Sequence, residues 1–166
     1  NKNDVKLFLQ ECINSKFIVD EVTKKKSTRK PSAPFITSTL QQEASNRLKF
    51  SPKKTMSVAQ SLYDNAYITY MRTDCYTLSD EAIELGKAKI IELFGEKYYN
   101  KIRKTNTKSK NSQEAHEAIR PTNFDLLDLS DDESMDEHQN KLYKLIYKRT
   151  MASLMTNASI EIITTK

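Results

Sequence analysis

The sequence has few of the residues that interrupt a chain with tight turns. Only two glycines and four prolines occur among its 166 residues. Because a many-stranded barrel needs frequent turns, this scarcity favours helices joined by polar loops. We therefore expect a mainly α fold of the α+β class.

Long apolar runs and closely spaced cysteines are missing as well. No stretch approaches the roughly 18 apolar residues that span a bilayer, and the polar, amphipathic start NKNDVKLFLQ is unlike a signal peptide. Cys12 and Cys75 lie far apart without metal-ligand spacing, which argues against a disulfide framework. We expect no membrane contact and a reducing, cytoplasmic location. Since the first residue is Asn1 rather than Met, we also expect an excised fragment or a processed product.

The overall amino-acid composition is typical of a soluble globular protein. Apolar residues make up 37% and charged residues 30% of the 166 residues, a length that suffices for one ordinary domain with a core. The formal net charge of +5 is compatible with nucleic-acid binding. Many basic proteins bind no nucleic acid, however, so charge alone assigns no function.

Hydrophobic periodicity predicts helices in the middle of the chain and strands near both ends. The predicted helices cover residues 4–13, a segment from 37–39 to Ser51-Pro52, segments that start near 54 and 79, and residues 114–120 and 137–155. The predicted strands cover residues 16–23, 67–71 and 158–165, with a linker at 24–34 and polar loops at 101–113 and 125–138.

Four of the predicted helices have an apolar stripe, and those that begin near residues 37–39 and 79 also have a start signal. The stripes comprise Leu40, Ala44 and Leu48; Met56, Ala59 and Tyr63; Ile83, Ile90, Ile91 and Phe94; and Leu142, Leu145, Ile146 and Leu154. Thr37, Ser38 or Thr39 is expected to cap the second helix, with Ser38 and Gln41 at the spacing of a capping box.

The two outer strands enclose a helical unit, which suggests a domain inserted into another domain. We place the inserted domain at residues 31–156, between pieces of a flanking domain at 1–30 and 157–166. The outer strands would then lack their partners in this chain. Inside the inserted domain, two helices, a short turn and the strand at 67–71 fit a winged-helix or helix-turn-helix unit of the CAP-like type.

The first segment with candidate catalytic residues is YITYMRTD, residues 67–74. In an extended conformation its side chains alternate: one face carries Ile68, Tyr70, Arg72 and Asp74, the other Met71 and Thr73. A tyrosine hydroxyl has a pKa near about 10 and must lose its proton to act as a nucleophile. A guanidinium two residues away favours the phenolate and binds phosphate, and Asp74 is placed to orient it. With 8 tyrosines in the chain, the chemistry alone favours a plain packing role for Tyr70.

The second such segment is QEAHEAIRPT, residues 113–122. In a helix, His116 and Arg120 share a face and together suit a phosphate, although Pro121 disfavours helical geometry at Arg120. The alternative is a surface helix end with a His–Glu contact. A zinc site is not expected, since no H-E-x-x-H occurs, and the acidic run 131–133 lacks the alternation of a magnesium site.

Residues 31–82 and 111–122 together resemble the tyrosine-bearing domain of type IA DNA topoisomerases of the bacterial topoisomerase I kind. The resemblance implies that Tyr70 attacks a DNA phosphodiester, leaving a 5′-phosphotyrosine and a free 3′-OH, and that Arg72 contacts the scissile phosphate. It implies single-strand DNA binding for His116, with Thr69, Asp74 and Arg120 as supporting DNA-binding candidates. Met71, where the topoisomerase III branch typically carries Pro, favours the topoisomerase I branch.

The same resemblance implies that this chain is one part of a larger enzyme. The parent would pass one strand through a transient break and relax negative supercoils without ATP. Its Mg²⁺ would be held by a separate Toprim domain outside these residues, so we expect no cofactor in this chain and no cleavage by the chain alone. The expected partners are DNA, preferably single-stranded, and the remaining domains of the enzyme.

This chain departs from the family pattern at three places: Cys75 replaces a frequent Ser, Asn65-Ala66 a frequent Ala-Gly or Gly-Gly, and Phe35-Ile36 a frequent Phe-Thr. None of these touches Tyr70, Arg72 or His116. Two other functions stay open. One is a non-catalytic winged-helix module that binds duplex DNA; the other is a helical interaction domain, which leaves both segments unexplained.

Overall fold

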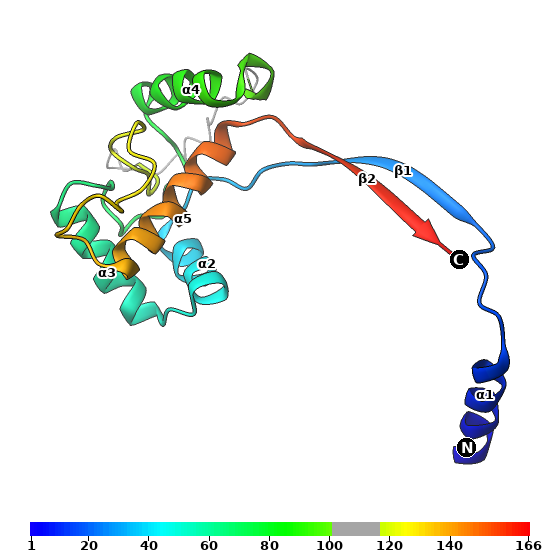
Figure 1. The fold of residues 1–166 in the computed structure, drawn as a ribbon. Coiled ribbons are helices and arrows are strands. Elements are labelled where there is room, and N and C mark those ends of the chain that lie inside the picture. Colours follow the sequence, from blue (N-terminus) through cyan, green and yellow to red (C-terminus); the bar gives the residue numbers. More distant parts are fainter. Residues whose placement is uncertain (101–116) are drawn as a thin grey trace. The chain divides into compact units, whose positions relative to one another are not determined.

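The structure is a computed structural model that describes residues 1–100 and 117–166. The chain divides into two compact units, residues 1–29 with 158–166 (unit 1) and residues 30–157 (unit 2). The described residues form five α-helices, a short 3₁₀-helix and a two-stranded sheet (Figure 1). The coarse expectation of helices combined with a little sheet is therefore confirmed.

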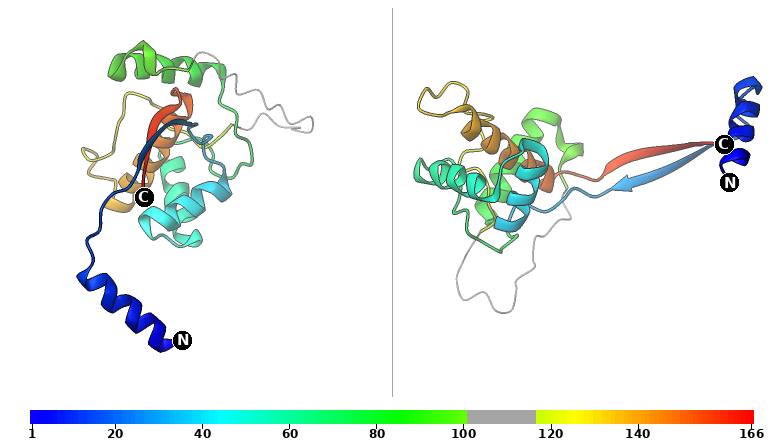
Figure 2. Two further views of the ribbon diagram at one scale, coloured as in Figure 1. Left: turned by 90° about the vertical axis from the view of Figure 1, so that its right-hand side faces the viewer. Right: turned by 90° about the horizontal axis from the view of Figure 1, so that it is seen from below.

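Unit 1 contains helix α1 (Lys2–Asn14) and strands β1 (Val22–Arg29) and β2 (Ala158–Thr165). The strands pair antiparallel from Val22↔Thr165 to Arg29↔Ala158, and the right-hand view of Figure 2 shows them side by side. The predicted strand at 158–165 is confirmed, and the prediction that the outer strands lack partners is wrong, because they pair with each other.

The prediction of a strand at 16–23 and a linker at 24–34 is wrong in its boundaries. Strand β1 begins only at Val22 and runs through the basic stretch to Arg29. Lysine-rich sequence has little intrinsic preference for strands, but the backbone hydrogen bonds to β2 outweigh this weak local bias. Among the residues that the structure describes, the strand side chains are almost all exposed.

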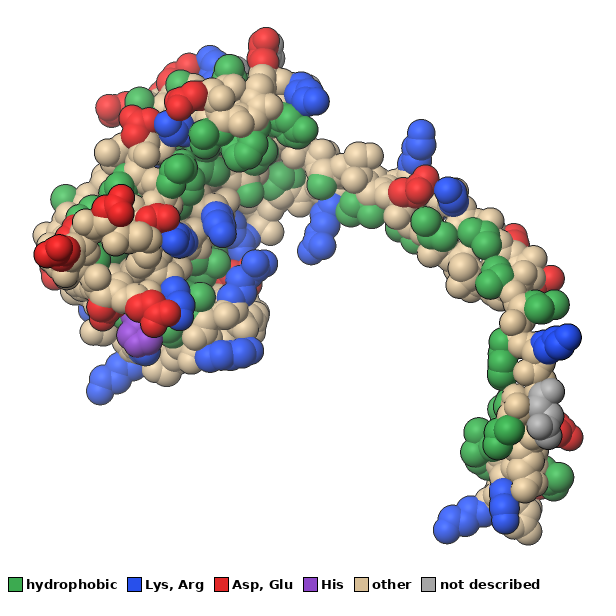
Figure 3. Space-filling model, viewed as in Figure 1, with side chains coloured by type: hydrophobic (Ala, Val, Ile, Leu, Met, Phe, Trp, Pro, Cys, Tyr) green, Lys and Arg blue, Asp and Glu red, His purple; other side chains and the backbone are tan. Residues whose placement is uncertain are grey.

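Unit 1 leaves large apolar side chains in contact with solvent, as Figure 3 shows over α1 and the two strands. The exposed apolar side chains of this unit are Val5, Leu7, Phe8, Leu9, Ile13, Phe17, Ile18, Val19, Val22, Ile162 and Ile163. The buried hydrophobic cluster of the described residues comes entirely from unit 2.

Unit 2 is built around helix α5 (Glu137–Leu154). Helices α2 (Thr37–Leu48), α3 (Pro52–Asp64) and α4 (Asp80–Phe94) all pack against α5, and the 3₁₀-helix η1 (Glu96–Tyr98) follows α4 (Figure 1). None of the helices within residues 1–100 and 117–166 is both long and apolar enough to cross a membrane.

The predicted helices that start near residues 37–39, 54, 79 and 137 are found, but two of the predicted buried faces are partly wrong. On α3 the fully buried residues are Thr55, Ala59 and Leu62, whereas Tyr63 is exposed. On α4 they are Ala82, Gly86 and Ile90, whereas Ile91 and Phe94 are exposed. Small residues lie in these interfaces because they let two helices approach closely, which a count of large apolar residues overlooks.

The start of α2 also differs from the prediction. Its N-cap is Ile36 and Thr37 is already helical, so none of residues 37–39 is the cap. Instead, the Thr39 hydroxyl accepts a hydrogen bond from the Ile36 backbone N–H at 3.0 Å. Helix α4 starts at Ser79 as predicted, and Ser51 and Asp136 are polar caps of α3 and α5.

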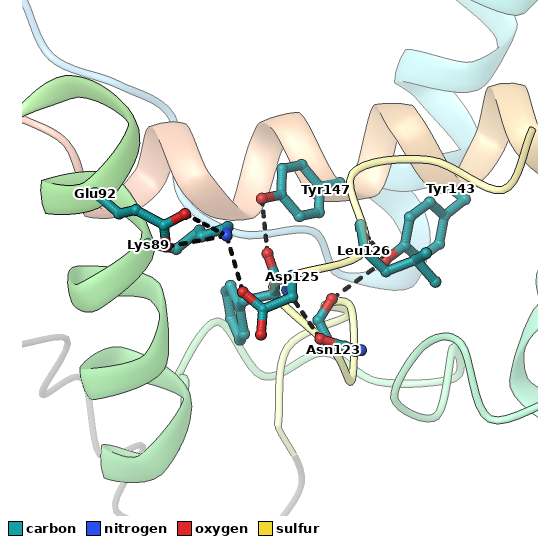
Figure 4. Close-up of polar contacts among 8 residues, drawn as sticks. Lys89, Glu92, Asn123, Asp125, Leu126, Tyr143 and Tyr147 are labelled. Atoms are coloured by element: carbon teal, nitrogen blue, oxygen red, sulfur yellow. Dashed lines mark hydrogen bonds and ion pairs between the residues drawn. The ribbon is translucent and has the colours of Figure 1, made fainter.

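The loop at residues 123–126 is fixed between α4 and α5 (Figure 4). The Tyr143 hydroxyl donates to the Leu126 carbonyl at 2.7 Å, and the Tyr147 hydroxyl donates to the Phe124 carbonyl at 2.9 Å. Burial raises the pKa of both tyrosines above the ordinary value. Lys89 of α4 adds an ion pair with Asp125 at 2.8 Å, which closes this side of unit 2.

Candidate active site

The two segments with candidate catalytic residues, 67–74 and the described part of 113–122, are far apart in the sequence but meet in unit 2. Ile68 and Pro121 form an isolated antiparallel bridge. On either side of it, the Thr69 N–H donates to the Arg120 carbonyl at 2.9 Å and the Thr122 N–H donates to the Tyr67 carbonyl at 3.1 Å. The predicted strand at 67–71 is wrong, because the pairing stops after this single bridge.

Residues 117–120 form no helix, and Ile119 makes an isolated bridge with Phe35, so the predicted helix at 114–120 is wrong for the part that the structure describes. The Ala118 N–H donates to the Thr77 carbonyl and the Ile119 N–H to the Phe35 carbonyl, each at 2.8 Å. These donors therefore bond to other segments rather than to a helix, as the following Pro121 favours. His116 lies outside the described residues, and so does its predicted pairing with Arg120 on one helix face.

Burial alternates along residues 70–74 as expected, although they form no strand. Tyr70 is 41% exposed, and Arg72 and Asp74 are exposed too, whereas Met71 and Thr73 are buried. The prediction that Ile68 shares the face of Tyr70 is wrong, because Ile68 is buried in the core.

Thr37, the first residue of α2, fixes the backbone of this segment. Its hydroxyl donates to the Met71 carbonyl at 2.8 Å and accepts from the Thr73 N–H at 2.9 Å. Its own N–H donates to the Thr73 carbonyl at 3.0 Å. The backbone that carries Tyr70 and Arg72 is therefore held by hydrogen bonds on both sides of Arg72.

Arg72 and Asp74 line a hollow of about 460 Å³ at the start of α2. Its other lining residues are Ile36, Thr37, Ser38, Gln41 and Thr73. A helix N-terminus carries partial positive charge, and a guanidinium adds a full one. The chemistry of this hollow suits an anionic oxygen close to the segment that carries Tyr70.

Arg120 is bound within the protein rather than presented to solvent. Its side chain is only 13% exposed, and Glu117 Oε2 accepts from its Nε at 3.0 Å and from its Nη2 at 2.7 Å. Its Nη1 donates to the Pro121 carbonyl at 3.1 Å. Glu117 also accepts the N–H of Ser79, the cap of α4, at 2.6 Å. Arg120 thus ties its own segment to the start of α4.

A ring contact next to Tyr70 was missed by the sequence analysis, which placed Tyr63 in a buried stripe. The rings of Tyr63 and Tyr70 meet edge to face, with centroids 5.2 Å apart and an interplanar angle of 66°. Exposed residues at a helix end have no sequence signature for such a contact, because it depends on the turn that follows the helix.

Comparisons with known proteins identify the family. A family model described as DNA topoisomerase matches residues 1–166. This chain belongs to the DNA topoisomerase family. It is 48% identical over 155 residues to a prokaryotic-type DNA topoisomerase 1 of Acanthamoeba polyphaga mimivirus, covering 93% of this chain and 18% of that protein. It is 44% identical over 172 residues to DNA topoisomerase 1 of Rickettsia felis, covering 98% of this chain and 22% of that protein.

A solved topoisomerase shares the fold. The structure of full-length topoisomerase I from Thermotoga maritima matches with a TM-score of 0.78 and 38% identity, over 96% of this chain and 26% of that one. This topoisomerase chain therefore spans about a fifth to a quarter of the length of the relatives named here.

The described part of this topoisomerase chain does not gather a magnesium site. No group of three or more His, Cys, Asp or Glu side chains converges there. In the acidic run, the Asp132 carboxylate accepts hydrogen bonds from the Tyr67 hydroxyl and from Ser134. The bond to Asp132 raises the pKa of Tyr67, since it stabilises the protonated phenol. The Asp132 carboxylate thus joins the acidic run to Tyr67.

Two of the departures from the topoisomerase pattern have a visible structural counterpart. Ala66 has φ of 58°, in the left-handed region that favours glycine. Cys75 is a free thiol whose Sγ lies 2.8 Å from the Thr77 hydroxyl, and its N–H donates to Thr73 Oγ1 at 3.0 Å. Cysteine therefore fits the site of the frequent Ser.

Proposed function

We propose that the full-length protein carrying this chain is a type IA DNA topoisomerase and that Tyr70 is its nucleophile. The observation that carries the proposal is the exposed phenol of Tyr70, on a backbone held by Thr37 and two residues from an exposed guanidinium. The family match over the whole chain supports it.

The proposed reaction keeps the free energy of the DNA phosphodiester bond in a bond between tyrosine and phosphate. The Tyr70 oxygen forms a bond to phosphorus while the bond from phosphorus to the 3′ oxygen breaks, giving a 5′-phosphotyrosine. The phenol proton is lost and the leaving 3′ oxygen gains one, so the products balance. Attack by the 3′-OH reverses the step and rejoins the strand. No ATP is required, and a strand passed through the break relaxes negative supercoils.

We assign Arg72 to the phosphate next to the broken bond. An exposed guanidinium offers a planar fork of donors to phosphate oxygens, and the hollow at the start of α2 gives such an oxygen room. Asp74 lines the same hollow and remains a candidate for orienting Arg72 or the DNA. His116 remains a proposed contact to single-stranded DNA.

The proposed DNA contacts of Arg120 and Thr69 are less direct. The guanidinium of Arg120 is already bound to Glu117 and to a carbonyl, and the Thr69 hydroxyl bonds to two backbone groups. We therefore propose that both residues act by holding the segment after His116 against the Tyr70 segment. Arg120 and Thr69 would therefore affect DNA binding and cleavage indirectly, by holding these two segments in place.

We propose that residues 31–156 are the active-site tyrosine domain, and that 1–30 and 157–166 are pieces of a flanking domain. The exposed apolar side chains of unit 1 support this proposal, because burial against further domains would remove them from water. Within the tyrosine domain, we propose a helix-turn-helix relation between α2 and α3, which serves as a framework for Tyr70.

The proposal is tested by covalent capture with the full-length enzyme. Single-stranded DNA labelled on the 3′ side of the break should become attached to the wild-type protein and not to Tyr70→Phe, which should still bind DNA. Tyr76→Phe is the matched control, because Tyr76 is 40% exposed and lies six residues away. Adducts that persist in Tyr70→Phe remove Tyr70 from its proposed role.

A second experiment addresses the metal and the alternative function. We propose that Mg²⁺ is held by a Toprim domain beyond these residues, so the isolated chain with Mg²⁺ should form no adduct. Weak, salt-sensitive binding that prefers single strands fits the topoisomerase, whereas tight, sequence-specific duplex binding favours a winged-helix module. Strand cleavage by the isolated chain would contradict the proposal of a separate metal domain.

A further inference from the structure

In the described part of the chain, the side chain of Tyr70 has one aromatic neighbour. Within residues 1–100 and 117–166, the ring of Tyr63 is the only group with which it makes a ring contact, hydrogen bond or ion pair. The contact is edge to face at 5.2 Å, and the two side chains are 40% and 41% exposed. An exposed ring without such a neighbour would move among several rotamers.

The backbone of Tyr63 is itself well fixed. It lies in the last turn of α3, directly after Leu62, which is fully buried in the core. The Tyr63 carbonyl accepts the Ala66 N–H at 2.8 Å, and the Leu62 carbonyl accepts the Tyr67 N–H at 2.9 Å. The carbonyls of Leu62 and Tyr63 therefore fix the turn between α3 and the Tyr70 segment, and the same turn places the ring of Tyr63.

We propose that Tyr63 is a positioning residue that holds the ring of Tyr70 in the rotamer needed for attack on phosphorus. The inference rests on the proposed function, since it assumes that Tyr70 is the nucleophile. Aromatic pairs prefer edge-to-face geometry, and reaction requires the attacking oxygen close to and in line with phosphorus. The ring of Tyr63 performs this task, and its hydroxyl does not.

The experiment measures the rate of adduct formation by the full-length enzyme at saturating single-stranded oligonucleotide. Tyr63→Leu should lower this rate roughly three- to tenfold, the range that one aromatic pair supplies. Its affinity for the oligonucleotide and its melting temperature should stay close to the wild type, because Tyr63 is exposed. Tyr63→Phe keeps the ring and should retain the wild-type rate.

The matched control is Tyr98→Leu. Tyr98 is 41% exposed in η1 and also has an aromatic neighbour, Phe94, with ring centroids 6.4 Å apart. This variant should form adducts at the wild-type rate. Tyr70→Phe should form none, and adducts in that variant would mean that the proposed function itself has failed.

Several results would overturn the positioning role while leaving the proposed function intact. One is a wild-type rate for Tyr63→Leu at saturating DNA. Another is a loss of affinity with an unchanged rate, which would make Tyr63 a binding residue. A rate for Tyr63→Phe as low as that of Tyr63→Leu would assign the effect to the hydroxyl.

Discussion

The hydroxyl of Thr69 accepts a hydrogen bond from the backbone N–H of Arg120 at 3.0 Å. The same hydroxyl donates to the Ala118 carbonyl at 2.7 Å. One threonine thus joins two segments about fifty residues apart and fixes the residue directly before Tyr70. This junction holds the tyrosine and the segment after His116 together.

Replacing Thr69 with Val should therefore damage both stability and activity. Valine keeps the shape but leaves the Arg120 N–H and the Ala118 carbonyl without this partner, which costs about 1–3 kcal/mol in the free energy of unfolding. Adduct formation by the full-length enzyme should fall as well, whereas Thr69→Ser should preserve both. Urea unfolding with an adduct assay checks this. Equal stability of the Val variant and the wild type would contradict it.

Ala66→Gly should stabilise unit 2. The left-handed conformation of Ala66 crowds its Cβ, and glycine removes that strain, although it also increases the freedom of the unfolded chain. The net gain in the free energy of unfolding should be roughly 0.5–1 kcal/mol. Ser57→Gly, at an exposed position inside α3, is the control and should destabilise. Denaturant titration of both variants decides whether the strain is present.

Gly86→Ala should destabilise, although alanine is the better helix former. A Cβ at Gly86 would lie 2.5 Å from Leu154 Cδ1 and 3.2 Å from Phe124 Cε1, so these packed side chains or the helix itself would have to shift. Overpacking of this kind costs about 1–3 kcal/mol, more than the gain in helix propensity. In a Leu154→Ala background the same change should cost less. Additive effects in this double-mutant cycle would show that the predicted collision does not occur.

Acid should weaken unit 2 between about pH 4 and about pH 2. The Ser130 N–H donates to the Asp128 carboxylate, and Lys144 pairs with it at 3.1 Å. The bonds from Ser130 and then from Lys144 lower the pKa of Asp128 from 3.8 to about 2. A carboxyl with a lowered pKa in the folded state stabilises above its unfolded pKa, and this contribution is lost as the pH falls through the folded value. Melting temperatures at a series of pH values should fall over this window, and less steeply for Asp128→Asn. Identical slopes for the two proteins would show that Asp128 makes no such contribution.

The helices of unit 2 were predictable because their signals are local. Ser51, Ser79 and Asp136 cap their helices, and Leu40 and Ala44 recur at the helical period. The resemblance to topoisomerases, rather than local chemistry, predicts a catalytic role for Tyr70. Chemistry alone predicts a packing role for this residue.

The meeting of the two segments was not predictable from local patterns. Ile68 pairs with Pro121 across more than fifty residues, and no short-range period encodes such a contact. The sequence also does not show that Glu117, while it binds the guanidinium of Arg120, accepts the N–H of Ser79, because Ser79 lies 38 residues away in the chain. The ring contact of Tyr63 depends likewise on the turn at Ala66.

The central claim, that Tyr70 captures phosphorus, is tested most directly by locating the DNA on the protein. The full-length enzyme is allowed to cleave a single-stranded oligonucleotide, quenched, digested with nuclease and trypsin, and sequenced by mass spectrometry. Cleavage after Lys54 and Arg72 yields one peptide with Tyr63, Tyr67 and Tyr70, so its fragment ions must distinguish them. We expect the nucleotide mass on Tyr70. Finding it on Tyr63, on Tyr67 or in any other peptide would show that Tyr70 is not the nucleophile.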